Sequence, residues 1–372
     1  MSLLGPVRCV RAYYCCGRCG EGRAPWDWAA GLTSRSFTPA AERLVCLAGT
    51  LSDGFEEAAS RVLPEMAGLK VAETTVQRTT EAAGRRVADH LHAGGLFAFP
   101  RPWNWHKDAH GRTCAYVGID LTGVRQQAED GGKAEGRMPY VAMVFNPVAE
   151  LPDDSPHRPP ADARMQARYL SGLYDLDALA VELRKQAGQV GMDRAERWIG
   201  LTDGGGGLEE FVRRNFPRDP VLILDFWHAS EHLTELGQLL HPSDEEARRR
   251  EVGEWCRTLK REGGARVLEV LEALPASRKP AVREKLAATL NYFRNNVHRM
   301  DYPTYVANGW CIGSGAVESA CKTIVGQRLK LSGMRWREYG TDTLCHLRAL
   351  FKSEAGQWQA FWRRAPQPKA AA

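Results

Sequence analysis

The sequence predicts an α/β protein with a mixed five-stranded sheet, an all-helical insertion and a helical segment in front of the sheet. Three runs with strand character follow one another between residues 114 and 174. Two further apolar runs end at Asp203 and Asp225, and a helical pattern precedes each of them. Residues 229–305 then have a helical pattern almost throughout, which predicts the insertion.

Composition restricts the class of protein. The chain has 372 residues, of which 44% are hydrophobic and 26% are charged, as in a globular chain of two or three domains. It contains no apolar run of roughly 18 to 20 residues and no signal-peptide core, so we expect a cytoplasmic protein that does not enter a membrane. The ten cysteines are then expected to be reduced thiols or metal ligands. The net charge of +5 suits a polyanionic partner but does not demonstrate one.

Residues 1–37 contain the string Y-Y-C-C-G-R-C-G, which resembles half of a zinc ribbon. Cys16 and Cys19 have C-x-x-C spacing on a glycine-containing turn and are the candidate zinc ligands. A structural zinc site needs about four ligands, and neither Cys9 nor Cys15 has the spacing of a second pair. The alternative is a small strand-rich segment with free thiols.

Residues 38–100 have a helical period and predict three short helices. Thr38 before Pro39 predicts a helix start, and Thr74 with Gln77 matches a capping box. A tight turn at Gly68 gives the last two helices helix-turn-helix proportions, so we expect a DNA-binding domain. The alternative is a helical hairpin that only packs. The residues expected to face the bases are Thr75, Gln77 and Arg78.

The run from residue 114 to 127 has Asp120 at the end of its strand, and residues 136–147 predict a second strand. A third strand follows at 168–174. Residues 175–190 and 208–216 predict helices, which alternate with the strands ending at Asp203 and Asp225. The resulting order, βββαβαβ, is typical of a ribonuclease H-like core, expected at residues 101–228 and 306–356. Residues 357–372 are expected to form a C-terminal tail.

The acidic residues indicate the chemistry. If the strands that end at Asp120 and Asp203 are neighbours, both carboxylates emerge at one edge of the sheet and can bind a divalent cation. Glu318, just after the Gly-Ser-Gly that starts a predicted helix, is the expected third ligand. Taken singly, Asp203 is also a common type of turn residue and Glu318 a common N-terminal helix acid.

Several strings resemble the ISKra group of bacterial insertion-sequence transposases over nearly the whole chain: R-T-C-A-Y-V-G-I-D-L-T-G-V-R-Q-Q, K-A-E-G-R-M, A-E-R-W-I-G-L-T-D-G-G-G-G-L-E, Y-F-R-N-N-V-H-R-M-D-Y-P and I-G-S-G-A-V-E-S-A-C-K. The resemblance implies a DDE transposase on a ribonuclease H-like fold, related in plan to Mutator-like and hAT enzymes. Asp120, Asp203 and Glu318 would form its metal-binding triad. Asp225 and His228 match a supporting D-x-x-H pair. Family members carry another cysteine pair upstream, which implies that this chain is shortened at its N-terminus.

The implied mechanism uses two Mg²⁺ or Mn²⁺ ions roughly 3.5 to 4 Å apart. One ion would activate a water or a DNA 3′-hydroxyl for in-line attack, and the other would stabilise the leaving 3′-oxygen. The implied partners are double-stranded DNA, as transposon ends and target, and further copies of the chain on that DNA. Because these partners are DNA, we expect the protein to associate with the bacterial nucleoid. A transposase-derived DNA-binding protein without catalytic activity is the alternative.

A basic and aromatic segment follows Glu318 and is expected to contact DNA phosphates and an unpaired base. A solvated helix face is the ordinary alternative for such a run. The residues concerned are Lys322, Arg328, Lys330, Arg335, Trp336 and Arg337.

The string H-A-S-E-H, from His228 to His232, matches the H-x-x-E-H pattern of inverted zinc peptidases. Because it follows a buried strand directly, we favour a pairing of His228 with Asp225 in support of the active site. His232 and Glu231 are then expected in the first turns of the insertion.

Overall fold

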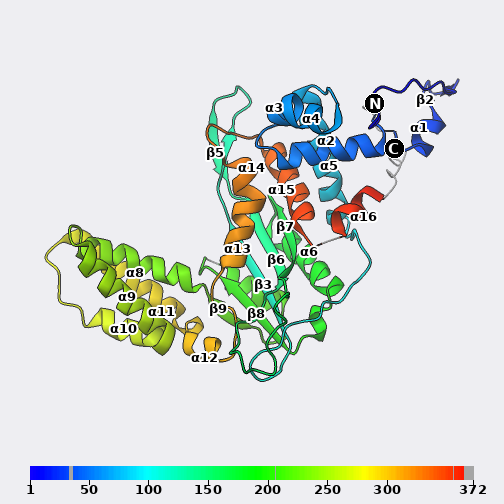
Figure 1. Cartoon of the computed structure of the whole chain (residues 1–372). Helices are drawn as coiled ribbons and strands as arrows, with labels where there is room; N and C mark the ends of the chain where they lie inside the picture. Colours follow the sequence, from blue (N-terminus) through cyan, green and yellow to red (C-terminus); the bar gives the residue numbers. More distant parts are fainter. Residues whose placement is uncertain (33–36, 206, 355, 364–372) are drawn as a thin grey trace.

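The computed structural model of the chain describes residues 1–32, 37–205, 207–354 and 356–363. Its centre is a mixed sheet with the strand order β7-β6-β3-β8-β9 (Figure 1). β3 pairs antiparallel with β6, and β6 with β7, whereas β3 with β8 and β8 with β9 are parallel. The predicted mixed five-stranded sheet is therefore confirmed. Its strands are β3 (Cys114–Leu121), β6 (Tyr140–Asn146), β7 (Gln166–Gly172), β8 (Arg197–Thr202) and β9 (Val221–Leu224).

A hairpin that the sequence did not predict projects from the end of β3. The run expected to be one strand divides near Gly123 into β3 and β4 (Val124–Gln127), and β5 (Lys133–Arg137) precedes Pro139 and β6. Glycine and proline interrupt strands, so these two residues are the signal for the division. The backbone of Trp336 bonds to Arg125 and Gln127 and so extends the hairpin at β4.

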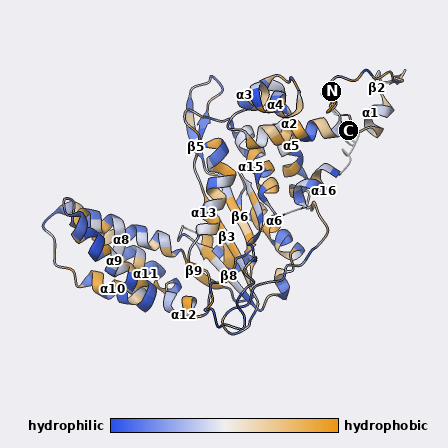
Figure 2. Cartoon of the chain, viewed as in Figure 1, coloured by the Kyte–Doolittle hydropathy of each residue, from blue (hydrophilic) through white to orange (hydrophobic). Residues whose placement is uncertain are grey.

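Helices cover both faces of the sheet, and Figure 2 shows hydrophobic residues concentrated between the layers. On one face α6 (Leu176–Gln189) packs against β6 and β7, and α7 (Leu208–Asn215) packs against β8. Alternate residues of β3, among them Ala115 and Val117, belong to the same hydrophobic cluster. On the other face lie α13 (Gly315–Ala320) and η4 (Cys321–Gly326), its π-helical continuation. The strands can be apolar on both sides because neither face is open to water.

α15 (Glu338–Lys352) packs along the outer strand β7. The Asp342 carboxylate accepts a hydrogen bond from the Leu173 amide just after that strand, at 2.8 Å, and the Ser353 hydroxyl accepts one from the Tyr169 amide at 3.0 Å. An uncovered edge strand would offer these amides to another chain. α15 therefore closes this edge of the sheet.

The helices of residues 38–100 have the expected order. Thr38 caps α2 (Pro39–Leu51) as predicted, because its hydroxyl accepts the Ala41 amide at 3.4 Å. A second helical stretch ends at Gly68, whose φ of 63° is left-handed, so the predicted turn is confirmed. The stretch comprises α3 (Phe55–Glu57), η1 (Ala58–Val62) and α4 (Leu63–Ala67).

The predicted capping box is wrong. α5 (Glu73–His92) starts after Ala72, which has no side chain to cap it, so Thr74 already lies inside the helix. α5 packs closely against both α2 and α15. A Cβ atom at Gly84 would lie 2.1 Å from the Thr343 carbonyl oxygen, so the two backbones are nearly in contact there. These helices share the core of the sheet and are not separate from it.

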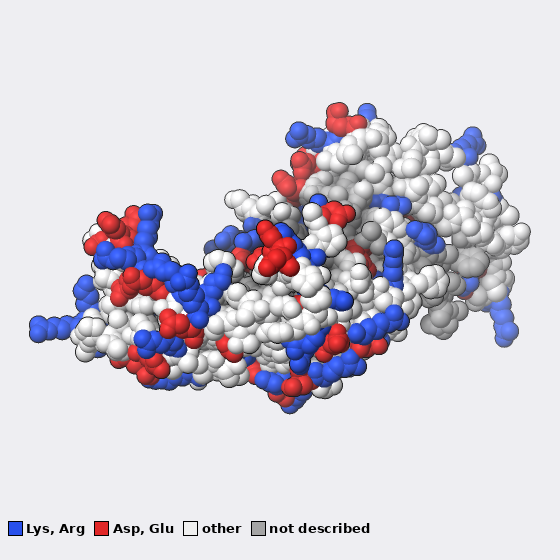
Figure 3. Space-filling view, turned by 60° about the horizontal axis from the view of Figure 1, so that its bottom comes forward, with Lys and Arg blue, Asp and Glu red and all other residues white. Residues whose placement is uncertain are grey.

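The predicted all-helical insertion projects from the sheet beyond β9 (Figure 1). Trp255, Leu259, Val267 and Leu271 are buried, in a hydrophobic cluster that continues to Ile223 and Leu224 of the sheet. Lysines, arginines and acidic residues are intermixed on the face of it seen in Figure 3. The insertion starts at Phe226, three residues before the predicted boundary. It contains α8 (Phe226–Leu240), α9 (Glu245–Glu262), α10 (Gly264–Glu272), α11 (Pro280–Asn296), η3 (Val297–Arg299) and α12 (Tyr302–Ala307).

The predicted C-terminal tail begins with a packed helix. Trp358 and Phe361 of α16 (Gln357–Arg363) are buried, and the Arg86 guanidinium lies 5.5 Å from the Phe361 ring centre. The rest of the tail, 364–372, lies outside the described residues. No helix in the described part of the chain is long and apolar enough to cross a membrane.

We predict that Gly84→Ala lowers the free energy of unfolding by about 1 to 3 kcal/mol, because the added methyl group forces α5 and α15 apart. Gly188→Ala is the matched control. Gly188 is exposed in α6, and nothing lies within 4 Å of its would-be Cβ, so alanine should stabilise that helix slightly. Chemical denaturation of both variants measures the difference, and equal stability would contradict the close approach.

Candidate functional site

Asp120 and Asp203 meet at the carboxyl edge of the sheet. β3 and β8 are parallel, with Gly118 paired to Leu201, and each aspartate comes two residues after that pair. Burial raises the pKa of the Asp120 carboxyl, and the negative charge of Asp203 raises it further. The predicted juxtaposition of these two acids is thus present in the structure.

Both carboxylates are oriented by neighbouring groups. One Asp120 oxygen accepts the Leu121 amide at 2.6 Å, and the other accepts the Cys321 thiol at 3.5 Å. One Asp203 oxygen accepts the Gly205 amide at 2.8 Å. Cys321 was not among the predicted site residues, although it lies one helical turn after Glu318 and so on the same side of that helical stretch.

Glu318 is carried to the sheet by α13. A Cβ atom at Gly118 would lie 2.3 Å from a Val317 methyl group, so α13 rests directly on β3 at that glycine. The Glu318 side chain is exposed and forms an ion pair with Lys322 at 2.6 Å. Among the described residues, no three His, Cys, Asp or Glu side chains are grouped closely enough to share one metal ion. The structure therefore brings two of the three predicted acids together and pairs the third with a lysine.

Asp225 connects the insertion to α13. It is buried at the end of β9 and accepts the amides of Trp227 and His228, at 3.0 and 3.3 Å, which caps α8. It also accepts the Ser314 amide at 2.9 Å and the Ser314 hydroxyl at 2.6 Å, just before α13. One carboxylate thus fixes the start of both helices.

The predicted pairing of His228 with Asp225 exists only through the backbone. The His228 imidazole lies 3.5 Å from the Glu231 carboxylate, because both belong to the first turns of α8. His232 stacks on Tyr292 with ring centres 3.9 Å apart. The expectation that His232 and Glu231 lie in the first turns of the insertion is confirmed. His228, Glu231 and His232 are not brought together with a further ligand within the described residues, as a zinc peptidase would require.

The end of the insertion holds the loop that carries Asp203. The Tyr292 hydroxyl donates to the Asp203 carbonyl at 3.4 Å, and buried Arg299 donates to the Thr202 hydroxyl at 2.9 Å. Glu209, just after the loop, accepts from His298 at 3.1 Å and pairs with Arg299 at 3.3 Å. The string N-N-V-H-R, from Asn295 to Arg299, thus contributes His298 and Arg299 to the support of the second acid.

Two separate sets of predicted DNA-binding residues line one groove of about 640 Å³. Gln77 comes from α5, and Arg335 and Arg337 come from the segment before α15. Thr75 is half-buried and Arg78 is exposed, and neither lines the groove. Of the other predicted cations, the Lys330 ammonium donates to the Thr122 hydroxyl at 3.0 Å, close to Asp120 in the chain, and Lys322 pairs with Glu318.

Arg328 and Trp336 do not face solvent, so the prediction that they lie on a DNA-contacting surface is wrong for this conformation. They are 1% and 8% exposed. Arg328 belongs to α14 (Gln327–Leu329), and its guanidinium lies 4.4 and 5.0 Å from the ring centres of Phe55 and Trp336. The Trp336 indole N–H donates to the Leu329 carbonyl at 3.1 Å. Their polar groups are therefore turned into the protein.

Cys16 and Cys19 lie on a tight hairpin between β1 (Tyr14–Cys15) and β2 (Gly22–Arg23), with α1 (Pro25–Ala29) next in the chain. The backbone N–H groups of Cys19 and Arg18 donate to the Cys16 sulfur and lower the pKa of its thiol. Both thiols are exposed. This geometry suits two ligands of a zinc ion, but no third ligand joins them within the described residues.

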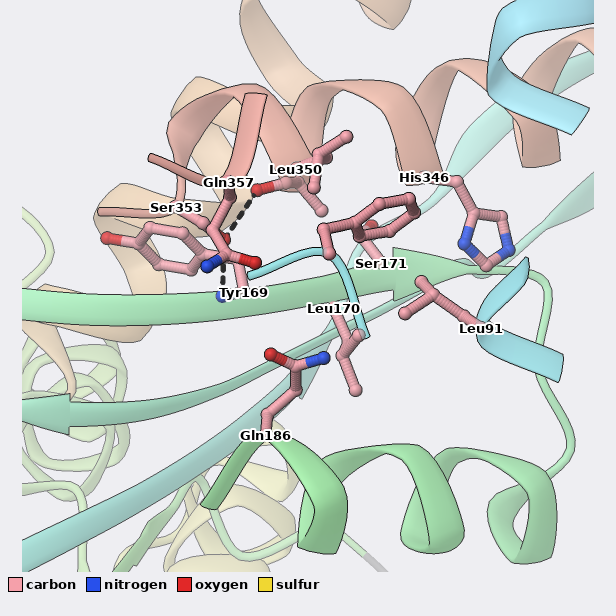
Figure 4. Close-up of a pocket in the computed structure, with 11 residues that line it drawn as sticks. Leu91, Tyr169, Leu170, Ser171, Gln186, His346, Leu350, Ser353 and Gln357 are labelled. Carbon is pink, nitrogen blue, oxygen red and sulfur yellow. Dashed lines mark hydrogen bonds between the residues drawn. The ribbon is translucent and has the colours of Figure 1, made fainter. Parts of the chain in front are cut away.

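A small pocket between β7, α6 and α15 has too little volume to be a substrate site (Figure 4). Its volume of about 10 Å³ has room for roughly one water molecule. Figure 4 shows Leu170 and Gln186 on one side of it and Leu350 and Gln357 on the other. We interpret it as a small packing gap in the core.

Comparison with known proteins does not assign the chain to a family. A scan against protein-family models gives no match, and a search of curated proteins gives none.

We predict that Ser314→Ala lowers the free energy of unfolding by about 1.5 to 3 kcal/mol, because it removes a hydrogen bond to a buried carboxylate. Ser319→Ala is the control, since Ser319 is exposed on the same helix and should change stability by less than about 0.5 kcal/mol. Urea denaturation compares the two, and a neutral Ser314 variant would show that Asp225 does not anchor α13 through this hydroxyl.

Proposed function

We propose that the chain is a DDE-type DNA transposase, which cuts phosphodiester bonds at the ends of a mobile element and joins them to target DNA. The observation that carries the proposal is the pair of carboxylates, Asp120 and Asp203, at the ends of two adjacent parallel strands. Phosphodiester transfer at such a pair depends on divalent cations.

The arrangement of the sheet supports a ribonuclease H-like core. Three antiparallel strands, β3, β6 and β7, come first in the sequence, with the β4–β5 hairpin inserted after β3, and two parallel strands are added beside β3. A helix precedes each added strand. This order is compatible with the fold expected from the sequence, and it puts the first two acids at one edge.

The donor set fits Mg²⁺ or Mn²⁺. Asp120 and Asp203 supply hard anionic oxygens, and their mutual repulsion is relieved when a divalent cation lies between them. Glu318 would join them after release from Lys322, since its side chain is exposed and on the helix that rests on β3. When bound, the cations activate the attacking oxygen and stabilise the leaving oxygen.

Protein groups around the acids would hold the carboxylates and attract the DNA. The Leu121 amide and Cys321 thiol fix Asp120, so little reorientation is needed on binding. Lys330, bonded to Thr122, places a positive charge close to this edge, where a DNA phosphate would approach. The insertion keeps the Asp203 loop in place through Tyr292 and Arg299.

A DNA-binding protein without cleavage activity is the second candidate. The ion pair of Glu318 with Lys322 favours it, because a carboxylate held by a lysine is withheld from a metal. Both candidates predict DNA binding, and only the first predicts cleavage.

We predict that Asp120→Asn, Asp203→Asn and Glu318→Gln each abolish strand cleavage and strand transfer while the protein stays folded. Each substitution removes a negative oxygen that the metal requires and keeps the size of the side chain. The assay uses labelled duplex DNA carrying the element's ends, with Mg²⁺ or Mn²⁺, and separates cut and joined products on a denaturing gel.

Glu210→Gln is the control, because this exposed acid pairs only locally with Arg214 and should leave cleavage unchanged. Retained cleavage in one of the three variants removes that residue from the proposed triad. DNA binding without any cleavage by the wild type would favour the second candidate.

A further inference from the structure

The groove lined by Gln77 and Arg335 has the size of a ligand site. Four segments of the chain form it: α3, the N-terminal half of α5, β4, and the segment from Arg328 into α15. Its volume of about 640 Å³ is in the range of roughly 300 to 1,000 Å³ that is usual for small-ligand sites. These segments are far apart in the sequence, so the site exists only in the folded chain.

The groove has an aromatic lining over a buried cation. Phe55 and Trp336 pack edge to face with ring centres 5.9 Å apart, and Met334 and Tyr339 add further apolar surface. Tyr339 is 49% exposed. Phe55 and Trp336 are only 7% and 8% exposed, so Tyr339 is the ring that can receive the flat face of a base.

The buried cation is Arg328. Its Nε donates to the Gly49 carbonyl at 3.2 Å, but its two terminal nitrogens are buried and have no hydrogen-bond partner within the described residues. No described carboxylate forms an ion pair with it, and burial lowers its pKa to about 10, so it remains charged near neutral pH. Asp53 acts on this charge only at a distance, without an ion pair, so the low-dielectric surroundings favour a further anion nearby.

The groove carries both positively charged arginines and carboxylates that accept hydrogen bonds. Arg335 and Arg337 are exposed and suit phosphate groups. α5 contributes Glu73 and Glu81, and the Gln77 side-chain amide donates to Glu81 at 2.9 Å. Carboxylates repel phosphates but accept hydrogen bonds from the amino groups of bases. A ligand that has both phosphates and base amino groups can bind the arginines and the carboxylates at the same time.

We propose that this groove binds unpaired nucleotides of the DNA substrate, with phosphates on Arg335 and Arg337 and an amino-bearing base edge on Glu81 and Glu73. The proposal rests on the proposed function, because it assumes that the chain handles DNA. Duplex DNA fits less well, since its base faces are stacked and cannot reach Tyr339 and Met334.

The groove lies within reach of the proposed cleavage site. Ten residues of nearly continuous helix lead from Glu318 to Arg328, which corresponds to a distance on the order of 15 Å. A strand opened near the cleavage site could therefore extend into the groove. Cytosine should be preferred to thymine, because thymine has no exocyclic amino group for the carboxylates.

The test is fluorescence anisotropy, without divalent metal, of labelled oligo-dC, oligo-dT and a duplex of equal length. Wild-type protein should bind oligo-dC about five- to tenfold more tightly than oligo-dT.

Glu81→Gln should reduce this preference to below about twofold. If Glu81→Gln does not fold, Glu73→Gln, at an exposed position, replaces it as the carboxylate variant. The double variant Arg335→Ala, Arg337→Ala should weaken both oligonucleotides alike and reduce the salt slope by about 1.4.

Arg214→Ala is the control for loss of a distant arginine, because Arg214 is exposed on α7, is not part of the groove lining, and should leave binding unchanged. Tighter binding of the duplex, no base preference, or the same affinity in the folded arginine double variant would overturn the proposal. Cleavage of end DNA by a wild type that shows no groove-dependent binding rejects the groove and keeps the proposed function. Groove-dependent binding without cleavage keeps the groove and counts against the proposed function.

Discussion

The parallel pairing of β3 with β8 is the constraint on which the site depends. Strands in parallel have their carboxyl ends at the same edge, so Asp120 and Asp203 must lie together although 83 residues separate them. An antiparallel pairing would send the two acids to opposite edges. Burial raises the pKa of Asp120, and this enforced proximity to Asp203 raises it further.

The rest of the chain is arranged around that edge. Gly118 allows Val317 to approach β3, which places the helix of Glu318 over the sheet. Asp225 anchors that helix and the first helix of the insertion with one carboxylate. The insertion in turn holds the Asp203 loop through Tyr292. A long helical insertion between the second and third acids therefore contributes to the geometry of both.

The sequence predicts features that follow from local pattern. Apolar runs that end in aspartate predict the strands before Asp120, Asp203 and Asp225, and the helical period predicts the insertion. Side-chain surroundings depend on tertiary contacts and were missed. A basic run has the same pattern whether its side chains are solvated or buried, so nothing local distinguishes Arg328, which is held by Phe55, from its exposed neighbours.

The pairs along one helix could have been predicted from spacing alone. Glu318 with Lys322 and His228 with Glu231 are four and three residues apart, which puts each pair on one face of a helix. The thiol of Cys321 on Asp120 could not be predicted, because it depends on where α13 and η4 cross β3.

Mn²⁺ binding followed by electron paramagnetic resonance tests the central claim, that Asp120 and Asp203 form one cation site, most directly. Wild-type protein should bind Mn²⁺, each of Asp120→Asn and Asp203→Asn should weaken that binding strongly, and the double variant should lose little more than either single variant. Wild-type affinity in both single variants, or independent additive losses, would contradict a shared site.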